Sequence, residues 1–210
     1  VLSDGKKNVE YLMPLSMKER VLESLGVDKF YIVEFDKEFA SLSPEQFAAQ
    51  YLIGLGVTHA VAGFDFTYGS KGMGNMDRLR SDSSALFDVT KVPKVECRGK
   101  KISSTIIRET LLNGNVEEIP DYLGCYYEIE SEWDGVSLKP VHYCTMPAEG
   151  SYFVTIKHKG VSVPAKIMVI EENGHRCLRA VSKIDNNILG KISIIWKERK
   201  RVESLLINFG

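Results

Sequence analysis

The periodicity of apolar residues changes once along this chain, near residue 124, and this change limits the possible folds more than any other feature. Before it, apolar runs at 29–35 and 57–63 alternate with helical patterns at 14–25 and 43–56. Such alternation is typical of an α/β fold built on a parallel sheet. After it, five short runs show period-two alternation between turn dipeptides such as DG, NG and NN, which predicts a small all-β barrel or sandwich.

The two patterns predict two domains, an α/β domain over residues 1–123 and a β-barrel over residues 124–210. The chain has 210 residues, of which 44% are hydrophobic, so each domain has enough apolar material for a core. The α/β domain is expected to contain a further helix at 76–87 and one or two short strands at 88–99. A closing helix is expected at 201–209.

Local signals mark two helix starts and one strand. Pro14 fits the first turn of a helix. Ser43 is an N-cap candidate, because Pro44 follows it and Gln46 stands at the capping-box spacing. The run KFYIVEF, residues 29–35, is rich in aromatic and β-branched residues and therefore predicts a buried strand.

Composition excludes several classes of protein. The net charge of −1 gives no basic excess, so nucleic acid is not an expected partner. No apolar run reaches the roughly 18–20 residues of a membrane span, and the first residues lack the layout of a signal peptide. The sequence carries no signal for an oligomeric state. We expect a cytoplasmic protein with reduced thiols and no bound metal, because the four cysteines are widely spaced and form no CxxC: Cys97, Cys125, Cys144 and Cys177.

Three consecutive hydroxyl groups open one helical pattern, at Ser103, Ser104 and Thr105. The first N–H groups of a helix have no intrahelical partner, and together with the helix dipole they favour an anion. Arg108 shares a helix face with Ser104 and Thr105, and a guanidinium group is suited to phosphate oxygens. An ordinary N-cap serine with a surface arginine explains the same residue types.

A glycine-rich loop, GFDFTYGSKGMGN, follows the apolar run 57–63 directly. Open parallel sheets bind ligands at the carboxyl ends of their strands, and glycines let the backbone come close to a ligand. The loop offers aromatic faces at Phe64, Phe66 and Tyr68 and an acceptor at Asp65. The same alternation of aromatic residues equally fits one buried face of a strand extension. The spacing matches neither a Walker loop nor GxGxxG.

Three pieces of the chain, taken together in this order and spacing, resemble one family. They are FDKEFASLSPEQF with GFDFTYG, then ISSTIIRETLLNG, then a β module that opens YYEIE. The chain resembles the prokaryotic bifunctional riboflavin kinase/FMN adenylyltransferases, also called FAD synthetases. The resemblance is strong over roughly residues 8–125 and weak after them.

The resemblance implies a Rossmann-like nucleotidyltransferase domain that transfers AMP from ATP to FMN and gives FAD and pyrophosphate. The small-molecule substrates would be ATP, with its Mg²⁺, and FMN. By resemblance, the ATP-binding residues are Ser103, Ser104, Thr105 and Arg108, of which Ser104 and Arg108 would be catalytic. The flavin-binding residues are Gly63, Asp65, Phe66, Tyr68 and Gly69.

Two departures from the family pattern modify this expectation. Family members carry an N-terminal GxFDGxHxGH segment that this chain lacks, and we expect that segment to precede Val1 in the natural protein. The β module has no PTAN motif, which in the family binds metal and phosphate. We therefore expect a degenerate riboflavin kinase-like barrel that keeps its fold and has lost kinase activity.

Two alternative functions stay open. One is a non-catalytic paralogue that binds a flavin or a nucleotide. The other is a nucleotidyltransferase of the same fold that acts on another phosphorylated acceptor.

Overall fold

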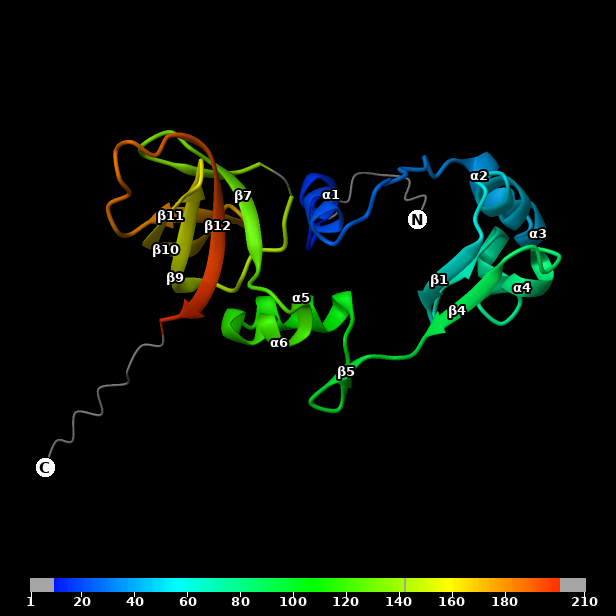
Figure 1. The fold of residues 1–210 in the computed structure, drawn as a ribbon. Helices are drawn as coiled ribbons and strands as arrows, with labels where there is room; N and C mark the ends of the chain where they lie inside the picture. Colours follow the sequence, from blue (N-terminus) through cyan, green and yellow to red (C-terminus); the bar gives the residue numbers. More distant parts are fainter. Residues whose placement is uncertain (1–9, 142, 201–210) are drawn as a thin grey trace, which may run out of the picture. The chain divides into compact units, whose positions relative to one another are not determined.

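The computed structural model describes residues 10–141 and 143–200. Among these, the chain forms two compact units, each described by itself below. The α/β unit comprises residues 29–101, and the barrel unit comprises residues 10–28 together with 102–200. Figure 1 shows the elements of both units and their labels.

The α/β unit is built on two parallel strands, β1 (His59–Gly63) and β4 (Asp88–Val92). They pair in register from His59 opposite Asp88 to Gly63 opposite Val92. Two small hairpins accompany this sheet, formed by β2 (Thr67–Tyr68) with β3 (Gly74–Asn75) and by β5 (Glu96–Cys97) with β6 (Lys100–Lys101). The helical elements of the unit are α2 (Lys37–Ser41), α3 (Pro44–Phe47), η1 (Ala48–Ile53), η2 (Ser70–Gly72) and α4 (Leu79–Asp82).

The predicted capping box is confirmed at the start of α3. The Ser43 hydroxyl accepts from the Gln46 backbone N–H, and the Gln46 side chain accepts from the Ser43 backbone N–H. Pro44 occupies the first helical turn, where its missing N–H costs no hydrogen bond. The predicted helix continues beyond α3 as the π-helical turn η1.

Two predictions for the α/β unit are wrong. The run 29–35 forms no strand, since no strand in the described residues pairs with it, and an unpaired strand leaves its backbone groups unsatisfied. Its side chains at Tyr31 and Ile32 are therefore 58% and 68% exposed. The helix predicted at 76–87 is only the short α4, because Ser84 and Ala85 adopt φ angles of 53° and 56°, which an α-helix does not permit.

The barrel unit contains a closed barrel of antiparallel strands in the order β10-β11-β8-β7-β12-β9. The predicted α/β sheet followed by a small all-β barrel is therefore confirmed. Five of the strands coincide with the predicted runs, and the sixth, β8, escaped prediction because it is short and ends in a proline. The strands are β7 (Glu128–Trp133), β8 (Leu138–Pro140), β9 (Gly150–His158), β10 (Val161–Glu172), β11 (His175–Ala180) and β12 (Gly190–Arg199).

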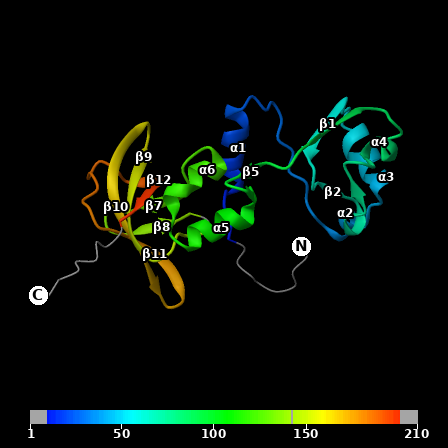
Figure 2. The same ribbon diagram turned by 90° about the horizontal axis from the view of Figure 1, so that it is seen from below.

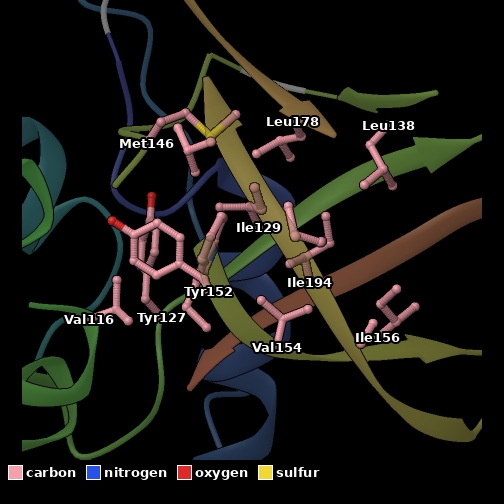
Figure 3. Close-up of a cluster of buried hydrophobic side chains, with 14 of the residues drawn as sticks. Val116, Tyr127, Ile129, Leu138, Met146, Tyr152, Val154, Ile156, Leu178 and Ile194 are labelled. Atoms are coloured by element: carbon pink, nitrogen blue, oxygen red, sulfur yellow. The ribbon is translucent and has the colours of Figure 1, made fainter. Parts of the chain in front are cut away.

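Alternate side chains of these strands fill the barrel interior (Figure 3). Ile129, Ile156 and Ile194 come from three different strands and are fully buried. Tyr152 packs edge-to-face on Trp196, with ring centroids 5.2 Å apart. This dense core stabilises the barrel independently of any ligand.

Helices also belong to the barrel unit. They are α1 (Leu15–Ser24), α5 (Ser104–Leu112), η3 (Val116–Glu118) and α6 (Ile119–Leu123). The helix predicted at 14–25 is α1, with Pro14 as its N-cap. Figure 2 shows α5 and α6 beside the barrel strands, and Leu111 and Ile119 extend the barrel core.

The compact units divide the chain differently from the predicted domains, because they group residues 102–123 with the barrel. The domain limits 1–123 and 124–210 stay a prediction. The closing helix predicted at 201–209 lies outside the described residues. Among the described residues, every helix is too short or too polar to be a membrane-spanning segment.

Candidate functional site

The glycine-rich loop begins at the carboxyl end of β1, as its position in the sequence predicts. The Phe64 backbone N–H donates to the Val92 carbonyl at 2.9 Å, so the first loop residue is still fastened to the end of β4. The Phe66 N–H then donates to the Gly63 carbonyl at 3.0 Å and closes a turn. The loop therefore leaves the parallel sheet at the edge where such sheets bind ligands.

Asp65 is held by a residue of the same unit that sequence reasoning did not assign to the site. The Lys101 ammonium donates to Asp65 Oδ2 at 2.5 Å, and it also lies 4.7 Å from the centre of the Phe64 ring. The hydrogen bond from Lys101 is the main reason that the pKa of Asp65 lies below its ordinary value. Lys101 thus fixes the loop at two consecutive residues and keeps Asp65 ionised.

Tyr68 is a core residue in this structure. Its side chain is 5% exposed, and its ring stacks on the rings of Phe47 and Phe66 with centroids 5.2 and 5.8 Å apart. Its hydroxyl donates to Asp82 Oδ2 at 2.6 Å. Burial, followed by the hydrogen bond to Asp82, raises the pKa of Tyr68. Phe66 remains 37% exposed, so one side of its ring is accessible to solvent while the Tyr68 ring stacks on it.

Gly69 adopts a backbone conformation that only glycine takes without strain. Its φ is 72°, and a Cβ atom at this position would lie 2.8 Å from the backbone nitrogen of Pro44. The next residue, Ser70, donates its N–H to the Leu42 carbonyl at 2.6 Å. The absence of a side chain at Gly69 therefore lets the loop lie directly against the start of α3.

The hydroxyl-rich helix start is α5, which lies in the barrel unit. Ser103 is its N-cap, and the Ser103 hydroxyl accepts from the Ile106 N–H at 3.4 Å. Ser104 and Thr105 are exposed on the first turn, and their hydroxyls make no hydrogen bond within the described residues. One of the three predicted hydroxyls thus caps the helix, and two are open to a ligand.

Arg108 makes two hydrogen bonds within the barrel unit. Its Nη1 donates to the Thr145 hydroxyl at 2.6 Å and to the Glu10 carbonyl at 2.9 Å. Thr145 is 1% exposed, and its carbonyl accepts from the buried Tyr127 hydroxyl at 2.9 Å. These contacts fix the position of the guanidinium group beside the first turn of α5. Among the described residues, its Nη2 and Nε atoms make no hydrogen bond.

The opposite face of α5 is anchored to the barrel. Ile107, Thr110 and Leu111 are buried, as the helical pattern predicts, and the Leu111 carbonyl accepts from the Ala148 N–H at 2.9 Å. Arg199, from β12, donates to the Asn113 carbonyl at 3.1 Å just beyond the helix. The start of α5 is therefore presented on a rigid support.

The predicted site residues thus fall into two groups. The flavin-binding candidates Gly63, Asp65, Phe66, Tyr68 and Gly69 lie together in the α/β unit, and the ATP-binding candidates Ser103, Ser104, Thr105 and Arg108 lie together in the barrel unit. The roles of both groups stay predictions. The described residues contain no cluster of three or more histidine, cysteine or acidic side chains that could hold a metal ion.

Comparison with known proteins places this chain in a family. The sequence model of the FAD synthetase family matches residues 1–106, half of the 210-residue chain. The chain belongs to the FAD synthetase family. The resemblance stated from its motifs is confirmed. The matched residues include the whole glycine-rich loop and the first three residues of α5, Ser104 to Ile106.

Curated members of the FAD synthetase family show how much of a longer protein this chain covers. This chain is 45% identical over 127 residues to the bifunctional riboflavin kinase/FMN adenylyltransferase of Listeria monocytogenes. The aligned residues cover 60% of this chain and 40% of that protein. The corresponding protein of Bacillus subtilis is 46% identical over 130 residues, with 62% and 41% covered. The chain therefore spans about 40% of the length of these bifunctional relatives.

Two further relatives are more similar to this chain in length. A protein named FAD synthetase from Listeria monocytogenes is 33% identical over 145 residues, which cover 68% of this chain and 58% of that one. A solved structure described as a macrolide-efflux protein from Streptococcus pneumoniae matches with a TM-score of 0.83 at 25% identity. The superposed residues cover 97% of this chain and 74% of the chain in that structure. The match agrees with the α/β sheet followed by a barrel.

Proposed function

We propose that this member of the FAD synthetase family is an FMN adenylyltransferase. It transfers the AMP group of ATP to FMN, and the products are FAD and pyrophosphate. The observation that carries the proposal is the match of residues 1–106 to the family, since this range holds all five flavin-binding candidates and three of the four ATP-binding candidates, Ser103, Ser104 and Thr105. The exposed hydroxyls of Ser104 and Thr105 at a helix start support it further.

The reaction needs no covalent intermediate on the protein. A phosphate oxygen of FMN attacks the α-phosphorus of ATP, a new P–O bond forms, and the bond to the bridging oxygen breaks as pyrophosphate leaves. The protein has to align two anions and to neutralise the charge that develops on the leaving group. A Mg²⁺ bound to ATP shares that charge.

In this proposal the first turn of α5 would supply part of the ATP phosphate site. Its N–H donors and the hydroxyls of Ser104 and Thr105 would hold phosphate oxygens. Arg108 is fixed through Nη1, and its Nη2 and Nε atoms are the donors that would reach a phosphate. In the α/β unit, Gly63 and Phe66 would form the backbone and aromatic surface against the flavin.

We propose further that riboflavin kinase activity is lost. In the region where the family carries its PTAN motif, this chain reads SEWDGVSLKPVHYCTMPAEGSYFVTI. The backbone there is engaged otherwise: the Tyr11 N–H donates to the Tyr143 carbonyl at 2.7 Å, and the Thr145 N–H donates to the Tyr11 carbonyl at 3.1 Å. The Thr145 hydroxyl is bound by Arg108. The Tyr143 carbonyl, the Thr145 N–H and the Thr145 hydroxyl are therefore already hydrogen-bonded within the protein.

One observation favours the alternative of a non-catalytic binding paralogue, namely that Arg108 is already bonded to Thr145 and Glu10. A single set of incubations separates the functions. The full-length protein is incubated with ATP, MgCl₂ and FMN, and in parallel with ATP, MgCl₂ and riboflavin, and the flavins are separated by chromatography. We expect FAD in the first mixture and no FMN in the second. FMN binding by calorimetry without FAD formation would establish the paralogue instead, and FMN formed from riboflavin would disprove the loss of kinase activity.

A further inference from the structure

A cavity lies wholly within the barrel unit, and none of its lining residues belongs to either candidate constellation. Its volume is about 710 Å³, within the range of small-molecule sites. It lies between α1 and the outer face of the barrel, and its walls come from α1, β7, β12 and the turn between β9 and β10. We call it the α1 pocket. Figure 1 shows α1 beside β7.

The floor of the α1 pocket is a row of polar side chains that crosses four strands. Lys157 on β9 pairs with Ser162 on β10 and with Ser193 on β12, and Ser193 pairs in turn with Glu130 on β7. Directly opposite residues of antiparallel strands project from the same face of the sheet. The row therefore places one ammonium group between two hydroxyls on the outside of the barrel.

The acidic end of the row is already neutralised. Glu130 is 3% exposed, and its carboxylate lies 3.1 Å from the Arg20 guanidinium of α1 and 3.1 Å from the Lys191 ammonium. The Ser16 hydroxyl donates to it at 3.4 Å. A carboxylate this deeply buried requires such partners, so Arg20 and Lys191 are committed to it.

The basic end of the row has no such compensation. Among the described residues, Lys157 and Lys159 make no ion pair or hydrogen bond, and neither do the hydroxyls of Ser162 and Ser193. The pocket lining contains four lysine or arginine residues and two glutamates, which is a formal surplus of two positive charges in a chain of net charge −1. An anion with about two negative charges would neutralise this positive surplus.

The backbone beneath Lys159 gives an independent observation. The hairpin from β9 to β10 turns on Lys159 and Gly160, with φ angles of 45° and 83°, and the hairpin from β10 to β11 turns on Asn173 and Gly174, with 54° and 76°. Two-residue turns with positive φ at both positions favour Asn-Gly, and lysine is an unfavourable residue there. A residue that is strained where a better one fits often has a functional role.

From this geometry we infer that the α1 pocket binds a small ligand that carries a diphosphate group. The Cα atoms of Lys157 and Lys159 are separated by His158, the last residue of β9, and therefore lie about 6–7 Å apart, so that each ammonium group can reach one of two linked phosphates. The hydroxyls of Ser162 and Ser193 donate to the same oxygens. Pyrophosphate and ADP share this chemistry, and inorganic phosphate lacks the second group. The inference does not depend on adenylyl transfer.

The test is a titration of the ¹⁵N-labelled chain with pyrophosphate, ADP and inorganic phosphate, followed by amide chemical shifts. We expect shifts at residues 157–162 and at Ser193, with pyrophosphate and ADP binding at least tenfold more tightly than phosphate. Lys157→Gln should weaken pyrophosphate binding at these amides about tenfold, the effect of losing one charge-assisted contact. Equal binding of phosphate and pyrophosphate, or shifts confined to other amides, would overturn the inference.

Two control variants distinguish the pocket from general charge. Lys139→Gln removes the same charge from an exposed lysine of β8, which lies 3.9 Å from Asp134 outside the pocket, and should leave binding unchanged. The double variant Lys159→Asn/Asn173→Lys exchanges the two turn residues, keeps the net charge and places asparagine in the pocket turn. We expect it to fold with an unchanged melting temperature and to bind pyrophosphate about fivefold more weakly. If it binds as the unaltered chain does, or if Lys139→Gln weakens binding equally, the α1 pocket is not the site.

Discussion

The Nη1 atom of Arg108 lies 2.6 Å from the hydroxyl oxygen of Thr145, and this hydrogen bond joins the first turn of α5 to the segment that precedes β9. The residue expected to bind phosphate is therefore also part of the internal support of the barrel unit. Its two roles are separable by experiment, because only one of them requires the Thr145 hydroxyl.

The first prediction concerns these two residues. Arg108→Ala should weaken ATP binding by about 1.5–3 kcal/mol, the range for a charge-assisted contact. Thr145→Val removes the hydroxyl that accepts from Arg108. It should lower the free energy of unfolding by about 1–3 kcal/mol, because the Arg108 guanidinium then lacks this acceptor. Calorimetry with an ATP analogue and urea unfolding measure the two effects. Thr145→Ser, which keeps the hydroxyl, is the control. ATP affinity that Arg108→Ala leaves unchanged would refute a phosphate role for this arginine.

The second prediction concerns the loop that follows β1. Gly69→Ala should destabilise the α/β unit by about 2–4 kcal/mol, through both an unfavourable φ and a clash with the backbone of Pro44. Gly56→Ala is the matched control, because Gly56 has a φ of 71° and nothing within 4 Å of the added Cβ. It should cost only about 1 kcal/mol. Equal losses of stability in chemical denaturation would show that the contact with Pro44 contributes nothing.

The third prediction concerns the pH dependence of Asp65. Its pKa is lowered mainly by the hydrogen bond from Lys101, so this interaction favours the folded state above the ordinary pKa of an aspartate and is lost as the pH falls through the lowered value. Lys101→Met should return the pKa of Asp65 towards its ordinary value. The side-chain carboxyl carbon of Asp65, followed by NMR during an acid titration, reports the change. Identical titration curves for both proteins would exclude Lys101 as the cause.

The fourth prediction concerns the thiols. Cys144 is 5% exposed, and burial is the main reason that its pKa is raised to about 11. Cys125 is exposed. At pH 8 a thiol reagent should modify Cys125 rapidly and Cys144 only after denaturation, because the thiolate is the reacting species. Mass spectrometry of the peptides locates the label, and early labelling of Cys144 would show that the segment around it opens readily.

Sequence alone was sufficient where the determining interactions are local. The capping box at Ser43 and Gln46 spans three residues, and the apolar face of α5 follows from helical spacing. Strand pairing is not local, and for that reason the run 29–35 was misjudged: its composition suits a strand, but no described strand lies beside it. The partner of Arg108 is 37 residues further along the chain, and no pattern in the sequence indicates it.

For the candidate site, sequence identified the types of residue and missed how the protein holds them. Tyr68 belongs to a motif that suggested a ligand contact, and the structure places its ring in the core. Lys101 was visible only as part of the basic stretch RGKK, although it fixes the loop at Asp65 and Phe64. The signal that would have found it is its place directly before the hydroxyl-rich helix start.

The order of the two units along the chain has a consequence for the protein's integrity. Residues 10–28 and 102–200 belong to one unit, so the segment 29–101 of the α/β unit is joined to the barrel unit at both of its ends. A cut within residues 63–75 would leave each fragment covalently joined to strands or helices of the same barrel. The two fragments would then stay together for as long as the barrel stays folded. The stability of the barrel therefore limits how long the two fragments stay associated after such a cut, even if the barrel performs no chemistry of its own.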